Sequence, residues 1–406
     1  MPEAVIVAAA RSPIGRAHKG SLIDVRPEDL AVAVIGAAFA QVPELDPTEA
    51  QDLYLGCAEP HDEHGANLAR RVAVQLGLDE LPGATVNRFC ASSVEATRIA
   101  FHSIRAGEGD VFVSAGVECV SRYAQSFTGT GGSWNVHPAF EPSRTRGARI
   151  AESNEQWTDP RQEGLLPDVF MTMGQTAENV ATLRGVSRSE QDEFAVLSQN
   201  RAEEAIAEGF YEREIVPFTK PDGTIVARDD SPRPGATLET LSALEPAFRV
   251  DGTVTPGNCC PLNDGAAALV VMSDTKASDL GIQPLARIVA TGTSALSPEI
   301  MGLGPIAASQ QALKRAGMTI DDVDLVEINE AFAAQVLPSA WELGIDIDKL
   351  NIKGGAIALG HPFGMTGARI TTTLLNALRS VDKEVGLETM CVGGGQGMAI
   401  IFERLS

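Results

Sequence analysis

Short apolar runs and segments with helical periodicity alternate along most of the chain. The apolar runs are four to nine residues long and indicate strands at 4–10, 52–57, 110–116, 264–272, 287–290 and 324–329. Apolar residues recur at the spacing of helices over 27–39, 67–76, 306–316, 330–343 and 369–378. A chain with 39 glycines and only 5% aromatic residues that alternates in this way predicts an α/β protein.

The two ends of the chain repeat the same order of elements. The strand at 52–57 corresponds in pattern to the strand at 324–329, and the strand at 110–116 corresponds to one near 389–392. Cys90 opens a helix 33 residues after Cys57, and His361 precedes a helix 32 residues after Asn329. This order predicts two similar βαβ-rich halves with one helix of each half packed centrally, which would bring Cys90 close to His361.

The region from about 120 to 258 has a different character. Clusters of Gly, Pro, Ser and charged residues surround two helical stretches, at 173–183 and 189–208, and the second follows a helix-start signal at Ser187. We predict a loop or cover domain inserted into the first half. The predicted parts are an N-terminal half at 1–119 that is completed by about 263–283, a cover domain at 120–262 and a C-terminal half at 284–406.

Composition narrows the classes of function. The chain has 406 residues and a formal net charge of −22, which argues against non-specific nucleic-acid binding and against association with anionic membranes. The six cysteines form no zinc-type pairs, and the segment His61–His64 between Pro60 and Gly65 favours a solvated loop over a metal site. With no basic leader and no membrane-length apolar run, we expect a soluble cytoplasmic protein without a metal.

Cys90 is the first candidate for chemistry. Small and apolar residues lead into it, and the helical pattern begins directly after it. A helix N-terminus lowers the pKa of a thiol and so favours the nucleophilic thiolate, while nearby backbone N–H groups can stabilise an oxyanion. Taken alone, the segment favours a packed core cysteine over a reactive one.

Three later segments supply what a cysteine nucleophile needs. Asn329 ends a strand, where ligand groups in α/β sheets lie, although a helix cap is the simpler interpretation of that residue alone. His361 stands among five glycines at 354–367, is held by the following proline, and is a plausible general base. Cys391 precedes a glycine-rich turn that begins with Val392 and Gly393, which fits a second reactive thiol beside free backbone N–H groups.

Four motifs follow one another along the chain: the segment around Cys90, Asn329-Glu-Ala-Phe332, Gly360-His-Pro362 and Cys391-Val-Gly-Gly-Gly-Gln-Gly397. Their order and spacing resemble those of the thiolase family over essentially the whole chain. The resemblance implies a layered α-β-α-β-α fold with a cover domain. It also implies a CoA-dependent acyltransferase without a permanently bound cofactor, which uses coenzyme A and acetyl-CoA as substrates.

The resemblance also assigns roles to residues. Cys90 would carry the acyl group, His361 would take its proton, and Cys391 would move the proton on the α-carbon of acetyl-CoA. One oxyanion hole would use His361 with a water on Asn329, and the other the N–H groups of Cys90 and Gly393. Four further residues match positions that contact CoA in the family, and for these a surface or core role remains an alternative; they are Arg233, Met173, Cys260 and Phe332.

Three positions depart from common family patterns. Ser93 stands where many members have Gly, Cys260 where short-chain synthetic members often have Ser, and Thr172 where those members often have His. These departures favour 3-ketoacyl-CoA degradation over dedicated acetoacetyl-CoA synthesis. A ketoacyl-synthase-type condensing enzyme is disfavoured by Cys391, and a non-catalytic CoA-binding protein would need an inert Cys90.

The resemblance further implies a homodimer or homotetramer, with a dehydrogenase or hydratase as a possible partner enzyme. Chain-length preference and physiological direction stay open at this stage.

Overall fold

The computed structural model describes residues 1–123, 136–153 and 155–406. Two strand groups share one continuous ladder. The first group has the order β4-β3-β5-β8-β1 and the second β10-β11-β12-β9, and they join where Val5 and Ile6 of β1 pair with Arg287 and Ala286 of β9. The strands are β1 (Ala4–Arg11), β3 (Asp52–Gly56), β4 (Gly83–Val86), β5 (Val111–Cys119), β8 (Asn263–Ser273), β9 (Ala286–Ala295), β10 (Leu325–Ile328), β11 (Val385–Val392) and β12 (Gln396–Arg404).

The two groups repeat one pattern of pairing. In the first, β3 is parallel to β5, and β8 is antiparallel to both β5 and β1. In the second, β10 is parallel to β11, and β12 is antiparallel to both β11 and β9. The repeat predicted from the sequence is therefore present, with β3 in the place of β10 and β5 in the place of β11.

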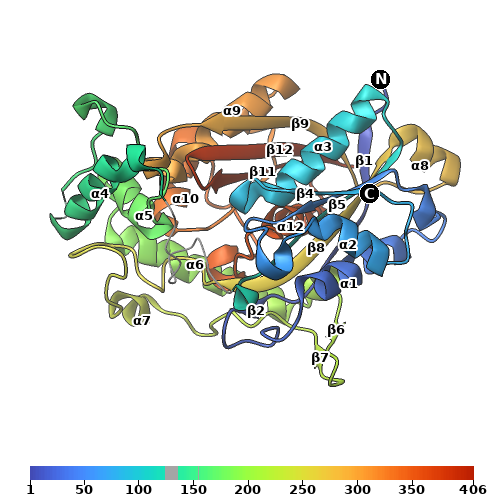
Figure 1. Ribbon diagram of the computed structural model, residues 1–406, viewed down its shortest axis with the longest axis horizontal. Helices are drawn as coiled ribbons and strands as arrows, with labels where there is room; N and C mark the ends of the chain where they lie inside the picture. Colours follow the sequence, from blue (N-terminus) through green and yellow to red (C-terminus); the bar gives the residue numbers. More distant parts are fainter. Residues whose placement is uncertain (124–135, 154) are drawn as a thin grey trace.

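The helices form the layers above, between and below the strands (Figure 1). α1 (Pro27–Ala40) and α2 (Leu68–Gln75) cover the outer face of the first group, and α9 (Gly304–Ala316) covers that of the second, with α10 (Ala333–Leu343) beside it. The central layer holds α3 (Ser92–Ala106) and α12 (Thr366–Ser380), which contact each other and both strand groups. Because strands such as β5 and β8 are covered on both faces, every residue of each is buried.

The two central helices approach each other closely at their N-terminal ends. A Cβ added to Gly367 would lie 2.4 Å from Val94 Cγ2, and one added to Gly116 would lie 2.0 Å from the carbonyl oxygen of Gly364. Glycine is therefore required at Gly367, where the two helix starts meet, and at Gly116 of β5, which packs against the loop before α12. This contact places the residues that precede α3 beside those that precede α12.

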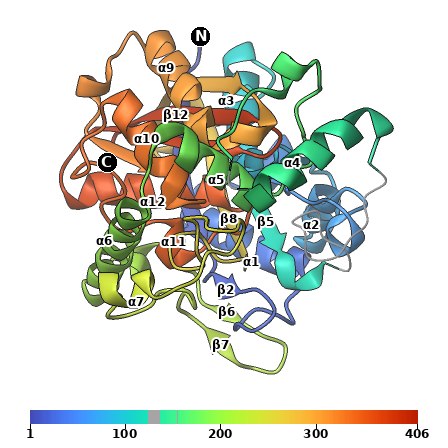
Figure 2. The ribbon, with the colours of Figure 1, turned by 90° about the vertical axis from the view of Figure 1, so that its left-hand side faces the viewer.

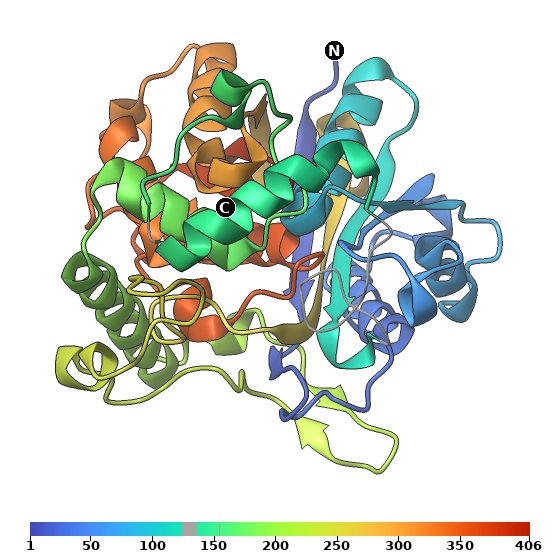
Figure 3. The ribbon, with the colours of Figure 1, turned by 60° about the vertical axis from the view of Figure 1, so that its left-hand side comes forward.

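The cover region packs on one side of both halves (Figures 2 and 3). It contains α4 (Glu141–Ser153), α5 (Met173–Arg184), α6 (Arg188–Ala207), the small hairpin β6 (Phe218–Thr219) and β7 (Ile225–Val226), and α7 (Leu238–Ser242). α6 begins with the predicted capping box, in which the side chains of Ser187 and Glu190 each bond the other's backbone N–H. The remaining short elements are β2 (Gly15–Arg16), α8 (Asp274–Leu280) and α11 (Ala356–Leu359).

The predicted α/β class and layered arrangement are confirmed, with one local correction. The helix expected from Glu330 begins at Ala333. The boundaries proposed for the three parts of the chain stay a prediction. Among the described residues, no helix combines the length and the apolar character needed to cross a bilayer.

Candidate active site

A single cavity of about 400 Å³ collects most of the predicted site residues. Cys90 and His361 lie on its wall, and so do Met173, Cys260 and Phe332. The rest of the wall is mostly apolar; it is formed by Phe170, Met171, Thr172, Gly174, Phe248, Cys259, Leu262, Met301, Ala331 and Phe363. The volume falls within the range of about 300 to 1,000 Å³ that is usual for small-molecule sites.

Cys90 lies in a short 3₁₀ turn, Phe89–Ala91, immediately before α3. Phe89 adopts φ +45°, a conformation that is uncommon for a residue with a side chain. The Ser92 hydroxyl holds this turn, since it donates to the Phe89 carbonyl at 2.6 Å and accepts from the Arg88 N–H at 2.9 Å. The backbone geometry thus fixes the sulfur at the start of the helix.

Burial dominates the ionisation of Cys90. It raises the pKa of the thiol to about 12, although the backbone N–H of Gly393 donates to the sulfur and acts in the opposite direction. The prediction that the helix start would lower this pKa is therefore wrong for the resting site. Cys90 therefore rests as a neutral thiol, and it would need a base to act as a nucleophile.

His361 is oriented by Thr366. The Thr366 hydroxyl donates to the Pro362 carbonyl at 2.7 Å, so its oxygen accepts from His361 Nδ1–H, also at 2.7 Å. Nε2 is then the unprotonated nitrogen of the ring. Burial, with Arg369 nearby, lowers the pKa of His361 to about 3, so the ring is neutral and free to accept a proton.

Asn329 contacts the free nitrogen of His361. Its side-chain Nδ2 lies 3.3 Å from Nε2, where it donates, and its Oδ1 is buried without a hydrogen-bond partner among the described residues. A buried amide oxygen left unpaired is costly unless a ligand or water occupies the position next to it. The pairing agrees with the predicted role of Asn329 beside His361, and the oxyanion hole itself stays a prediction.

The second thiol, Cys391, is fully buried near the end of β11 and does not appear on the cavity wall. Burial raises its pKa, and the neighbouring Cys90 raises it further. Burial also raises the pKa of Cys260, with Cys259, Cys90 and Cys391 adding to the effect. Cys260 is therefore close enough to three other thiols to interact with them electrostatically, and Cys391 is also close to Cys90.

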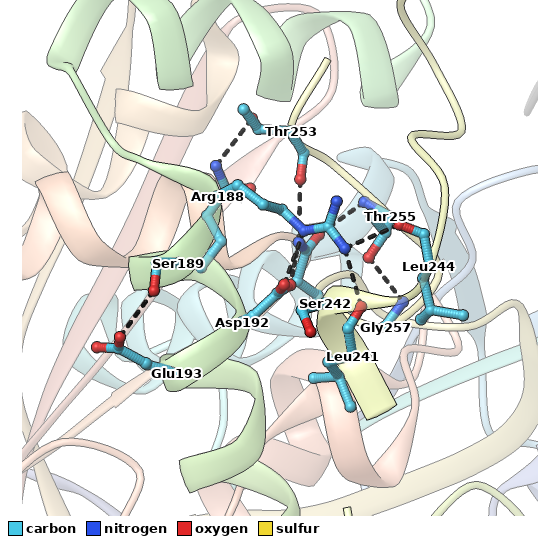
Figure 4. Close-up of polar contacts among 12 residues, drawn as sticks. Arg188, Ser189, Asp192, Glu193, Leu241, Ser242, Leu244, Thr253, Thr255 and Gly257 are labelled. Carbon is cyan, nitrogen blue, oxygen red and sulfur yellow. Dashed lines mark hydrogen bonds and ion pairs between the residues drawn. The ribbon is translucent and has the colours of Figure 1, made fainter. Parts of the chain in front are cut away.

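The wall that carries Cys259 and Cys260 is held by the cover region. Asp192 of α6 accepts from Asn258 Nδ2 at 2.9 Å and pairs with Arg188 at 2.7 Å. Arg188 also donates to two carbonyls at the end of α7, as Figure 4 shows. The cover region thereby fixes the residue directly before the two cysteines.

Arg233 does not line the cavity. Its side chain donates to the Pro256 carbonyl at 3.2 Å, and it lies close enough to Cys259 to interact electrostatically. Its predicted role in CoA binding stays a prediction. The His61–His64 segment ends in a 3₁₀ turn in which His61 pairs with Glu59 and Asp62. The prediction of a solvated loop is wrong for His64, which is fully buried and accepts from the Cys119 N–H.

Sequence reasoning missed several residues of the site. Thr366 carries no signal of its own, because a threonine at a helix start is normally a cap. Met301 and Phe170 come from segments far apart in the chain, and only the folded structure brings them to one wall. An apolar cluster at 169–173 within the otherwise polar cover region was the one available hint.

Comparison with known proteins identifies the family. The family models described as thiolase, N-terminal domain and thiolase, C-terminal domain match residues 4–275 and 282–404. The chain is 42% identical to a 3-ketoacyl-CoA thiolase of Aeromonas hydrophila, with 100% of both chains covered. It is 39% identical to a 3-ketoacyl-CoA thiolase of Bacillus subtilis, covering 99% of this chain and 100% of that protein.

A solved structure agrees with these relatives. The crystal structure of the Bacillus anthracis acetyl-CoA acetyltransferase superposes with a TM-score of 0.86 at 39% identity, covering 100% of this chain and 99% of that one. Sequence, fold and the meeting of Cys90, Phe332 and His361 at one cavity lead to the same conclusion. The chain belongs to the thiolase family.

Proposed function

We propose that this CoA-dependent acyltransferase cleaves 3-ketoacyl-CoA thioesters with neutral, apolar acyl chains through an acyl-Cys90 intermediate. One observation carries the proposal: a neutral thiol and a neutral, unprotonated imidazole face the same apolar cavity. A thiol that is not ionised at rest suits a nucleophile that loses its proton only as it attacks.

In the first half of the proposed reaction, the Cys90 sulfur attacks the ketone carbon of the substrate while His361 Nε2 takes the thiol proton. The bond between the α- and β-carbons then breaks, which leaves the acyl group on Cys90 and an acetyl-CoA enolate. Cys391 donates its proton to the α-carbon, so acetyl-CoA leaves and Cys391 becomes a thiolate. The negative charge that develops on oxygen would be met by protonated His361 and by the N–H groups of Cys90 and Gly393.

In the second half, the thiol of free CoA enters. The Cys391 thiolate takes its proton, and the CoA sulfur attacks the acyl-Cys90 carbonyl. The shortened acyl-CoA leaves, and His361 returns its proton to the Cys90 sulfur. Each thiol and the imidazole end as they began, so the steps require no additional cofactor.

The wall of the cavity supports an apolar acyl chain. Among the described residues that line it, none carries a carboxylate, an ammonium or a guanidinium group, while several Phe and Met side chains are present. A terminal carboxylate on the acyl chain would have no cationic partner there. Two relatives of similar length are named 3-ketoacyl-CoA thiolases, and this supports a degradative role in fatty-acid oxidation.

The test is thiolysis of 3-ketoacyl-CoA substrates of increasing length by free CoA, followed by loss of the ketoacyl-CoA absorbance. Cys90→Ala serves as the control, and mass spectrometry of quenched enzyme should find the acyl group on the Cys90 peptide. Unchanged turnover by Cys90→Ala would refute the assignment. Turnover limited to acetoacetyl-CoA would favour the activity named for the Bacillus anthracis relative instead.

A further inference from the structure

A buried carboxylate joins the cavity wall to the C-terminal half. Glu299 lies in the short 3₁₀ segment Pro298–Leu303 and is 1% exposed. Its Oε2 accepts from Trp157 Nε1 at 2.7 Å, and its Oε1 accepts from the Asp168 backbone N–H at 2.9 Å. The guanidinium of Arg146, on α4, lies 3.8 Å from the same carboxylate. Three separate parts of the cover region therefore converge on one side chain.

The segment that carries Glu299 is itself rigidly seated. A Cβ added to Gly304 would lie 2.1 Å from the Gln396 carbonyl oxygen, and one added to Gly302 would lie 2.6 Å from Gln335 Cβ. Backbone packed this closely against β12 and α10 leaves little room to shift. Glu299 thus offers the cover region a fixed point, and Met301, two residues along, is part of the cavity wall.

The contacts of Glu299 lead directly to two other wall residues. The Asp168 side chain accepts from the Phe170 N–H at 2.9 Å, which forms the turn into the wall. Asn179 Nδ2 donates to the Glu299 carbonyl at 2.9 Å and lies 3.3 Å from Met171 Sδ. Phe170 is therefore held by a residue that the Glu299 carboxylate binds, and Met171 contacts a residue that the Glu299 backbone carbonyl binds.

We propose that Glu299 is a positioning residue that determines acyl-chain specificity, because it holds the Phe170–Met171 wall against Met301. The inference rests on the proposed function, since it takes the acyl chain to lie along this wall. A fixed apolar wall contacts each added methylene group and so adds binding free energy, whereas a loosened wall makes fewer of these contacts. Glu299 touches neither Cys90 nor His361, so it affects the binding of the acyl chain and does not take part in the chemical steps.

The experiment compares Glu299→Gln with the unsubstituted protein on acetoacetyl-, 3-ketohexanoyl-, 3-ketooctanoyl- and 3-ketodecanoyl-CoA. In the unsubstituted protein, kcat/KM should rise by up to about fourfold for each methylene that the cavity buries. In Glu299→Gln the NH₂ group must face either the Asp168 N–H or the Trp157 and Arg146 side chains, so we expect the increase in kcat/KM for each methylene to fall below about twofold. Trp157→Phe removes one donor and keeps an aromatic ring, so its increment should lie between the two.

The increment, which is the fold-change in kcat/KM for each added methylene, is a ratio between two substrates of the same protein. A smaller folded fraction therefore does not change it. Glu214→Gln is the matched control, because Glu214 is also a buried glutamate paired with an arginine, Arg11 at 2.8 Å, and is not part of the wall. It should keep the unsubstituted increment even if it is less stable. An unchanged increment in Glu299→Gln would overturn the inference. A flat profile in the unsubstituted protein would instead contradict the proposed apolar-chain substrate.

Discussion

Replacing Thr366 with valine tests how His361 is prepared for catalysis. Valine keeps the size and branching of threonine but removes the hydroxyl that accepts from His361 Nδ1–H and donates to the Pro362 carbonyl, both at 2.7 Å. Thr366 is fully buried, so water cannot replace these partners at the surface. Each unpaired group costs about 1–3 kcal/mol of folding free energy.

The larger consequence concerns the tautomer of His361. Without an acceptor at Nδ1, the ring lowers its energy by moving the proton to Nε2 while the Asn329 amide turns over, so that its Oδ1, which has no hydrogen-bond partner among the described residues, accepts from Nε2–H in place of the donor now 3.3 Å away. In the proposed reaction, Nε2 is the nitrogen that must accept the Cys90 proton. Because general-base catalysis contributes about a hundred- to ten-thousandfold, we expect kcat to fall by about a hundred- to a thousandfold.

The assay is a rapid-quench measurement of Cys90 acylation, together with steady-state kcat and KM for acetoacetyl-CoA. Acylation should slow in parallel with kcat, while KM stays within about threefold because the cavity wall is unchanged. Thr366→Ser is the matched control, since it retains the hydroxyl and should retain most of the activity. If Thr366→Val acylates Cys90 as fast as Thr366→Ser, the hydroxyl does not set the tautomer and this account of the base is wrong.

Three further substitutions test other features. Ser93→Ala removes the hydroxyl that accepts from the Ala368 N–H at 3.0 Å, and it should lower the free energy of unfolding in urea by about 1–3 kcal/mol. Gly116→Ala places a methyl group 2.0 Å from the Gly364 carbonyl oxygen, in the loop that follows His361. This overpacking should cost at least about 1–3 kcal/mol of folding free energy, so both the thermal midpoint and kcat should fall. Burial raises the pKa of Glu388 to about 8, so the folded state holds a proton that the unfolded state releases above about pH 4.5, and stability falls as pH rises through that window. Glu388→Gln should reduce this loss in thermal scans between pH 5 and 8, whereas Glu403→Gln, at a partly exposed position, should not.

The sequence carries much of this fold because its signals are local. The apolar run of β5 and the glycines around His361 record burial and close approach at single positions, and the order of strands and helices repeats in both halves. The repeat alone places the starts of α3 and α12 together, and with them Cys90 and His361. No comparable signal marks Glu299, because its partner Trp157 lies 142 residues away and neither residue sits in a motif.

The ionisation of Cys90 shows where such reasoning fails and what the failure means chemically. A helix start predicts a lowered pKa for the thiol, but the sulfur lies within a mostly apolar cavity, and burial is the stronger effect. Burial acts on His361 in the opposite direction and keeps it unprotonated. The site therefore rests without a buried ion pair, which would be costly to maintain in an apolar cavity. In the proposed reaction, charge then appears only when the thiol attacks, where Gly393 N–H and the imidazolium can stabilise it. The burial that outweighs the effect of the helix start would therefore keep this electrostatic stabilisation for the transition state.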